Sequence, residues 1–166
     1  MPLVLSGTNG ISTNGTNWAL QPDSSGRVRL PNQTAFYAMY PASTVVNQST
    51  VTFTATRVNV GNAYSTSTGR FTCPVAGTYF FTAYFRMNPL PGVYVHPRFF
   101  VNGISIGDSY SIQASDGGGN DYVGTTLTAL YTMAAGDYIN CDLSGGNSAS
   151  TSLESSQCRF MGWLVA

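Results

Sequence analysis

The sequence contains no lysine, and its seven positively charged residues are all arginine. Charged residues make up only 8% of the chain, against roughly a quarter in an ordinary soluble domain. The net charge is zero and the arginines are scattered, so the sequence lacks the basic patch of a nucleic-acid-binding protein. No apolar run approaches the ~20 residues of a membrane span, and residues 1–5 lack the basic start of a signal peptide. We therefore expect no nucleic-acid partner, no membrane insertion and no secretory route.

Cysteine and histidine are also scarce. Cys73, Cys141 and Cys158 are odd in number and have no metal-ligand spacing, so three buried thiols are expected, with one disulfide and one free thiol as the alternative. His96 is the only histidine, and neither a nucleophile nor an orienting carboxylate lies near it in the sequence. The acidic residues are scattered and form no pair suited to glycan cleavage. No catalytic residue can be assigned, and we expect no enzymatic activity.

Three aspartates, Asp108, Asp116 and Asp121, lie in or beside predicted turns of one region. Oxygen ligands on loops suit calcium, but this spacing matches no defined calcium-binding loop. Solvated turn residues are the favoured interpretation. No cofactor is expected, and calcium held by these three aspartates is the alternative.

Residues 1–33 differ from the rest of the chain and are predicted to form an N-terminal docking arm. They repeat a Thr-Asn-Gly unit, with turn signals at Asn9-Gly10 and Asn14-Gly15, and their apolar residues stand singly among turn residues. Such a segment cannot build a core alone, so we expect it to pack on another protein. The residues expected to make this contact are Leu3, Leu5, Trp18 and Leu20.

From Thr34 onward, strand-like runs alternate with turn clusters at roughly the 8–12-residue spacing of an all-β sandwich. No window shows the periodicity of a helix. Asn102-Gly103 is a two-residue hairpin signal, and Ala134–Asp137 is a predicted turn. Residues 34–166 are therefore predicted to form one all-β domain. Its predicted strand-like runs are 35–40, 51–56, 63–72 with a turn at Gly69, 77–86, 93–101, 104–106, 122–133, 138–143 and 158–165.

The segment Gly77–Arg86 is the most informative strand, because it is rich in aromatic and β-branched residues and has no internal glycine or proline. Its side chains alternate between two faces, and large aromatic residues occupy both. One face is expected to enter the core of the domain. The aromatic residues assigned to the core are Tyr79, Phe81, Phe85, Tyr131 and Phe160.

The opposite face of the same strand carries Phe80 and Tyr84. In an antiparallel sandwich only one face of a sheet meets the domain's own core, so another surface must cover these two rings. A second copy of the chain is the expected cover. We therefore predict an interface between copies that contains Phe80, Tyr84 and Trp163.

Four motifs, Gly69–Phe81, Asn102-Gly103, Ala135–Asp137 and Phe160–Leu164, follow one another in a characteristic order. In that order they resemble the globular head of the complement q subcomponent, which is related to tumour necrosis factor. The resemblance covers about residues 35–166 and implies a ten-strand antiparallel jelly roll. It also implies a homotrimer in which the aromatic faces of the inner sheets meet at a threefold axis. The collagen-like stalk of the complement protein has no counterpart in this sequence.

The N-terminal stretches Leu3–Ile11 and Trp18–Val28 resemble the lead-in of bacteriophage fibre and other virion proteins. This resemblance implies a virion structural protein that is assembled in the host cytoplasm and carried on the extracellular particle. The expected role is a trimeric tail fibre or tip that docks on other virion proteins through its arm and binds a host surface glycan or protein. The alternatives are a capsid decoration protein and a secreted recognition module like the complement head.

Overall fold

The computed structural model describes residues 4–6, 10–12, 18–30, 33–41, 44–46, 50–88, 94–106, 112–113, 122–144 and 151–166. The chain divides into two compact units, Met1–Gln33 and Thr34–Ala166. This division falls at the boundary proposed for the docking arm, although docking itself remains a prediction. Each unit is described by itself below.

The N-terminal unit is a single antiparallel sheet in which the strands follow one another in chain order. The strands are β1 (Val4–Ser6), β2 (Gly10–Ser12), β3 (Trp18–Pro22) and β4 (Val28–Arg29). Leu5, Trp18 and Leu20 lie in these strands, whereas Leu3 lies outside the described residues. Sequence patterns gave only isolated apolar residues here, because strands this short contain too few residues to show alternation.

The turn between β3 and β4 is organised by Asp23. Its carboxylate accepts hydrogen bonds from the amides of Ser25 and Arg27, at 2.9 and 3.0 Å. The other carboxylate oxygen lies 2.7 Å from the Nε of Arg27. An aspartate that bonds the backbone a few residues ahead favours a tight turn, so the sequence Asp23–Arg27 fixes this hairpin locally.

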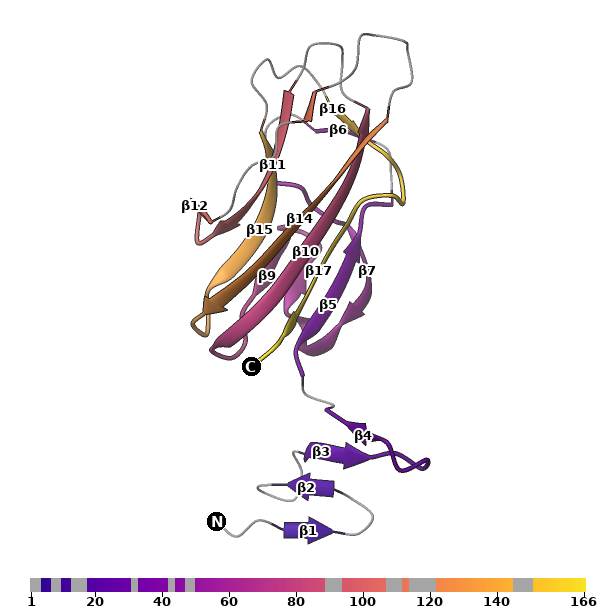
Figure 1. The fold of residues 1–166 in the computed structure, drawn as a ribbon, viewed down its shortest axis with the longest axis vertical. Helices are drawn as coiled ribbons and strands as arrows, with labels where there is room; N and C mark the ends of the chain where they lie inside the picture. Colours follow the sequence, from indigo (N-terminus) through magenta and orange to yellow (C-terminus); the bar gives the residue numbers. More distant parts are fainter. Residues whose placement is uncertain are drawn as a thin grey trace. The chain divides into compact units, whose positions relative to one another are not determined.

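The second unit is an antiparallel sandwich of two layers, with ten principal strands in the described part (Figure 1). The first sheet has the order β14-β10-β17-β5-β7. Its strands are β5 (Ala35–Met39), β7 (Ala55–Asn59), β10 (Gly77–Asn88), β14 (Val123–Met133) and β17 (Arg159–Leu164). Two short strands, β6 (Thr44–Val46) and β16 (Thr151–Leu153), extend this sheet beside the end of β10.

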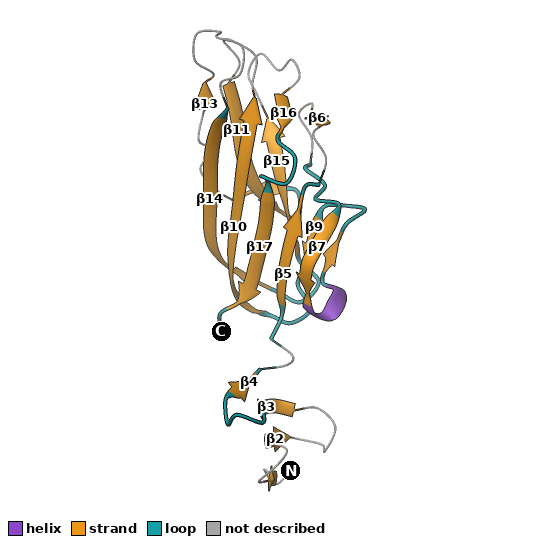
Figure 2. Ribbon diagram, turned by 90° about the vertical axis from the view of Figure 1, so that its right-hand side faces the viewer, coloured by secondary structure: helices purple, strands orange, loops and turns teal. Residues whose placement is uncertain are grey.

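The second sheet has the order β12-β11-β15-β9-β8, and Figure 2 shows the two layers from the side. Its strands are β8 (Tyr64–Ser65), β9 (Arg70–Thr72), β11 (Tyr94–Val101), β12 (Ile104–Ser105) and β15 (Tyr138–Ser144), with β13 (Ile112–Gln113) paired to β11. The described residues contain one short 3₁₀ turn, Val60–Asn62, and no helix long and apolar enough to cross a membrane. The prediction of an all-β jelly roll is confirmed.

The strand predicted over residues 51–56 is displaced in the structure. The segment does alternate, because Val51 and Phe53 are fully buried. It is nevertheless joined to the second sheet only by single contacts, such as the Val51 amide to the Cys141 carbonyl at 2.8 Å. Regular pairing begins at Ala55, where β7 joins β5 in the first sheet. The predicted run therefore contains two core residues, but the regular strand begins only near its end, at Ala55.

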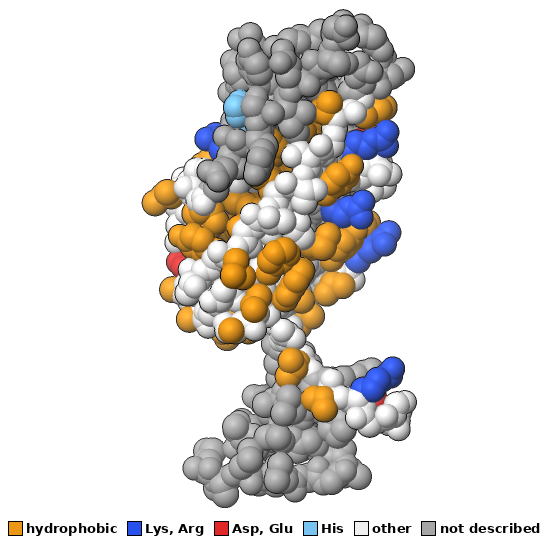
Figure 3. Space-filling view, in the orientation of Figure 1, with side chains coloured by type: hydrophobic (Ala, Val, Ile, Leu, Met, Phe, Trp, Pro, Cys, Tyr) orange, Lys and Arg blue, Asp and Glu red, His pale blue; other side chains and the backbone are white. Residues whose placement is uncertain are grey.

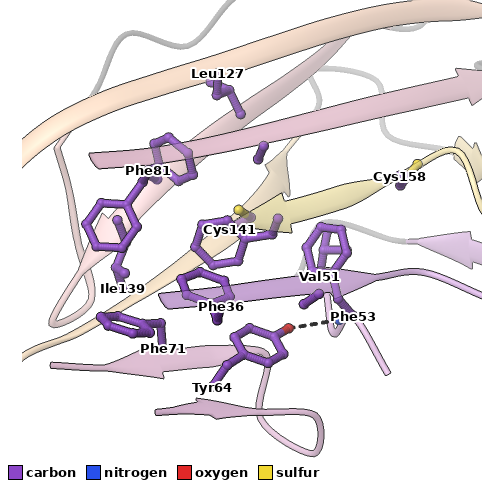
Figure 4. Close-up of a cluster of buried hydrophobic side chains, with 14 of the residues drawn as sticks. Phe36, Val51, Phe53, Tyr64, Phe71, Phe81, Leu127, Ile139, Cys141 and Cys158 are labelled. Atoms are coloured by element: carbon purple, nitrogen blue, oxygen red, sulfur yellow. Dashed lines mark hydrogen bonds between the residues drawn. The ribbon is translucent and has the colours of Figure 1, made fainter. Parts of the chain in front are cut away.

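The core between the sheets is rich in aromatic rings (Figure 4). Along β10 every second residue from Tyr79 to Met87 is buried, as strand geometry requires. The second sheet contributes Phe71, Phe99 and Ile139. The hydroxyl of the buried Tyr64 accepts a hydrogen bond from the Phe53 amide at 3.2 Å. Four of the predicted core aromatics are fully buried: Tyr79, Phe81, Phe85 and Phe160.

Tyr131 is the exception among the predicted core residues, because its side chain is 36% exposed. It pairs with Tyr79 across β14 and β10 and therefore lies on the same side of the sheet as that buried ring. However, β14 is the outermost strand of the first sheet, and a side chain there is only partly covered by the opposite layer. The assignment of Tyr131 to the core was wrong.

Two turns at one end of the sandwich are tied together. Asn102 and Gly103 have φ angles of 50° and 82°, the left-handed conformations that a two-residue hairpin of this type requires. The Asn102 side chain donates to Asp137 Oδ1 at 2.8 Å and accepts from the Tyr138 amide at 3.0 Å. Asp137 also accepts from the Ala134 amide at 2.8 Å. The hydrogen bond from Asn102 and, to a lesser extent, that from the Ala134 amide hold the pKa of Asp137 below its ordinary value.

All three cysteines, Cys73, Cys141 and Cys158, are buried and free. Cys141 is the most enclosed, and burial raises the pKa of its thiol well above the ordinary value. The Cys158 thiol donates to the Arg86 carbonyl at 3.3 Å. The expectation of buried thiols is confirmed, and the disulfide alternative is wrong.

Limited proteolysis with trypsin should separate the two units. The cleavable residues outside the jelly roll are Arg27, whose side chain is 75% exposed, and Arg29. The other five arginines all lie in strands of the jelly roll. Native digestion should therefore leave one stable fragment that begins at Val28 or Leu30, which intact mass will identify. Early cleavage after Arg57 or Arg98 would show that the jelly roll is not the stable unit.

Candidate oligomer interface

The outer face of the first sheet carries a row of apolar side chains that crosses four strands. Phe80 on β10 pairs with Leu130 of β14 on one side and with Trp163 of β17 on the other. Trp163 in turn pairs with Ala35 of β5. The rings of Phe80 and Trp163 lie 4.7 Å apart at 40°, so they are in contact within one chain. Leu130 and Trp163 are nevertheless 65% and 40% exposed.

The next row along the sheet continues the apolar surface over β17, β5 and β7. Met161 of β17 pairs with Tyr37 of β5, and Tyr37 pairs with Val58 of β7. On the other side of the Phe80 row, β10 and β14 carry the paired threonines Thr78 and Thr132, whose hydroxyls are 3.0 Å apart. Figure 3 shows this face, with hydrophobic groups gathered beside a diagonal band of uncharged polar atoms. We call this surface the seam face, defined by Phe80, Leu130, Met161, Trp163 and Tyr37.

Arginines stacked on tyrosines occupy the far end of the same sheet. The Arg159 guanidinium lies 5.4 Å from the ring centre of Tyr84, its partner across β17 and β10. Arg86 lies 4.3 Å from the ring centre of Tyr122. The carboxylate of Glu154, which is hydrogen-bonded to Tyr122, raises the pKa of that tyrosine. This end of the sheet is therefore polar and positively charged, in contrast to the row around Phe80.

The family described as C1q domain matches residues 35–165. The chain belongs to the C1q domain family. Its C1q domain coincides with the second unit, and the N-terminal unit lies outside the matched residues. C1q and tumour necrosis factor-like domains are in general non-enzymatic recognition or structural modules and typically form trimers.

Two solved structures are similar to this C1q domain in fold. The globular domain of the zebrafish complement 1qA protein matches with a TM-score of 0.62 and 19% sequence identity. The matched region covers 80% of this chain and 98% of the zebrafish chain. The Eiger tumour necrosis factor of S. frugiperda matches with a TM-score of 0.60 and 10% sequence identity. The matched region covers 81% of this chain and 94% of the Eiger chain. At these identities the likeness establishes the jelly-roll fold.

The structure brings all three predicted interface residues of the C1q domain to one face. Phe80 and Tyr84 are half-buried within the chain, and Trp163 is exposed. Whether copies of the chain meet there remains a prediction. Sequence reasoning missed Leu130 and Met161, although the alternation of β14 with its core residue Leu127 was a signal that could have placed Leu130 outward.

Of the remaining candidates for chemistry, only the histidine is among the described residues. His96 is on β11 of the second sheet, half-buried, and pairs with Ser144 of β15. The proposed calcium ligands Asp108, Asp116 and Asp121 lie outside the described residues. Within the described ranges, no group of three histidine, cysteine or acidic residues could hold a metal ion. The described part of the C1q domain therefore offers the partly exposed apolar seam face and no cluster of metal-ligating side chains.

Proposed function

We propose that this chain is a non-enzymatic, homotrimeric binding module whose copies meet through the seam face. The observation that carries the proposal is the apolar row Leu130–Phe80–Trp163, which one chain leaves partly uncovered. Surfaces of this kind in soluble proteins mark interaction sites. A second copy is the favoured cover because this family typically forms trimers.

The narrower role that we propose is in a bacteriophage tail fibre or tip that binds a host surface glycan or protein. Two features support it: the separate N-terminal unit, and the Asn-, Gly- and Thr-rich sequence of that unit. The N-terminal unit would then attach the trimer to other virion proteins. The C1q domain would carry the receptor-binding surface.

Labelling of intact particles tests this placement. The particles are purified from a host whose prophage or infecting phage encodes this chain. In electron micrographs of these particles, an antibody raised against residues 34–166 should label the tail tip. Labelling spread over the head would overturn the fibre role in favour of capsid decoration. Absence of the chain from purified particles, together with its recovery from the culture medium, would overturn both and favour a secreted recognition module.

A further inference from the structure

Two arginines and two tyrosines alternate at the polar end of the first sheet. We call this group the tyrosine–arginine corner: Arg159 over Tyr84, and Arg86 over Tyr122. The two stacks adjoin, because Arg86 pairs with Gly124 and the ring of Tyr84 lies beside that glycine. A Cβ at Gly124 would come within 2.9 Å of the Tyr84 hydroxyl, so glycine leaves the space that the ring occupies.

The corner carries an excess of positive charge in the described part of the chain. Arg57 lies on the same sheet, with its guanidinium 5.8 Å from the ring centre of Tyr37. Glu154 is the described carboxylate at this end, and its hydrogen bond goes to Tyr122. Among the described residues no carboxylate lies within 4 Å of the guanidinium groups of Arg57, Arg86 or Arg159. Aromatic faces rather than acidic groups therefore accommodate these charges.

The second sheet differs in this respect. There Arg98 of β11 stands opposite Asp142 of β15 in the strand register, so a basic and an acidic residue face each other. The charge imbalance is thus a property of the sheet that carries the seam face. Figure 3 shows arginine side chains gathered along one side of that sheet.

Stacking on a ring covers a planar face of the guanidinium and leaves its in-plane N–H donors available. Those donors match the two oxygens of a carboxylate, phosphate or sulfate. If copies of the chain meet at the seam face, each contributes Arg86 and Arg159, and like charges are brought together in a poorly hydrated contact. A bound anion would relieve that repulsion.

We propose that the tyrosine–arginine corner binds an oxyanion, and that this anion links the copies so that assembly depends on it. The inference rests on the proposed trimer. An oxyanion fits better than a nucleic acid, because a neutral chain with scattered arginines lacks the extended basic surface that a phosphate backbone needs. The anion can be free phosphate or the acidic group of a sugar, which share this chemistry.

Sedimentation of the full chain, at constant ionic strength in chloride, tests the inference. Titration with inorganic phosphate should favour the trimer by roughly tenfold or more in its dissociation constant, and should raise the melting temperature. Glucuronate compared with glucose separates the two sources: a response to glucuronate alone assigns the site to an acidic sugar, and a response to phosphate alone assigns it to a free anion.

Arg159→Gln and Arg86→Gln should each remove this dependence. Arg70→Gln is the matched control, since Arg70 lies 4.1 Å from the ring centre of Tyr138 on the second sheet. The control also measures the general effect of phosphate on stability. If neither phosphate nor glucuronate changes the dissociation constant of the trimer, the anion site is overturned and the trimer stands. The same conclusion follows if Arg86→Gln responds to the anion as strongly as the parent. A monomer under all conditions would overturn the proposed trimer itself.

Discussion

Changing Phe80 to Asp should abolish the proposed trimer and yield monomers or aggregates. Each large aromatic side chain offers about 150–250 Å² of surface, and covering ~100 Å² more of the Phe80–Trp163 pair contributes about 2.5 kcal/mol per chain at ~25 cal/mol per Å². The variant removes this gain and buries a carboxylate against its counterparts in the other copies. Desolvation of an unpaired charge costs several kcal/mol more. Sedimentation of parent and variant at matched concentrations measures the result.

Ile104→Asp is the matched control for that experiment. Ile104 is 71% exposed on β12, at the edge of the second sheet, so the same charge enters the chain far from the seam face in the strand order. This variant should sediment like the parent and melt at a similar temperature. The parent should also melt at a temperature that rises with protein concentration, because assembly is coupled to folding. A soluble, trimeric Phe80→Asp protein with an unchanged melting temperature would place the interface elsewhere.

Much of the jelly roll was predictable because its strands carry local signals. In β10, period-two alternation of large rings identified both faces, and the burial of Tyr79, Phe81 and Phe85 follows from that pattern. Asn102-Gly103 predicted its hairpin because few dipeptides tolerate two successive left-handed conformations. These inferences need only neighbours in the sequence. They do not need to know which strand pairs with which.

Features that depend on which strands pair were harder to predict from the sequence. Tyr131 belongs to the alternating set of β14, but the outermost position of that strand leaves it exposed, and sheet order cannot be read from alternation. Residues 51–54 alternate like a strand yet pair only at isolated points, whereas β7 begins at Ala55. The short strands β6 and β16 are supported by each other and by β10 rather than by their own sequence.

The contacts of the arginine side chains in the structure offer a physical reason for the lack of lysine. All five jelly-roll arginines lie with their guanidinium groups between 4.1 and 5.8 Å from the centre of an aromatic ring. A planar guanidinium stacks on a ring and still donates hydrogen bonds at its edge, which the compact ammonium of lysine does not do as well. The pairs include Tyr84 with Arg159, which are distant in sequence, so the pattern was invisible before the strand register was known.

Changing Phe160 to Ala should cause the largest loss of stability among single truncations in the core. Its ring is fully buried, and the rings that it contacts come from both sheets. The ring centres lie between 4.8 and 6.3 Å away and belong to Phe36, Phe53, Tyr64, Phe81 and Phe99. A cavity among so many rigid neighbours cannot collapse easily. The expected cost is therefore near the upper end of the ~3–5 kcal/mol found for such changes.

Phe100→Ala is the matched control, because Phe100 follows a core residue on β11 but points outward beneath the guanidinium of Arg98, at 5.1 Å. Its cost should be roughly 1 kcal/mol. Denaturant unfolding at one fixed protein concentration compares the two variants while holding the contribution of assembly constant. A loss of ~4 kcal/mol is a large part of the ~5–15 kcal/mol that keeps a domain folded, so Phe160→Ala should be marginally stable at best. Equal losses in the two variants would show that the cluster around Phe160 does not join the two sheets energetically.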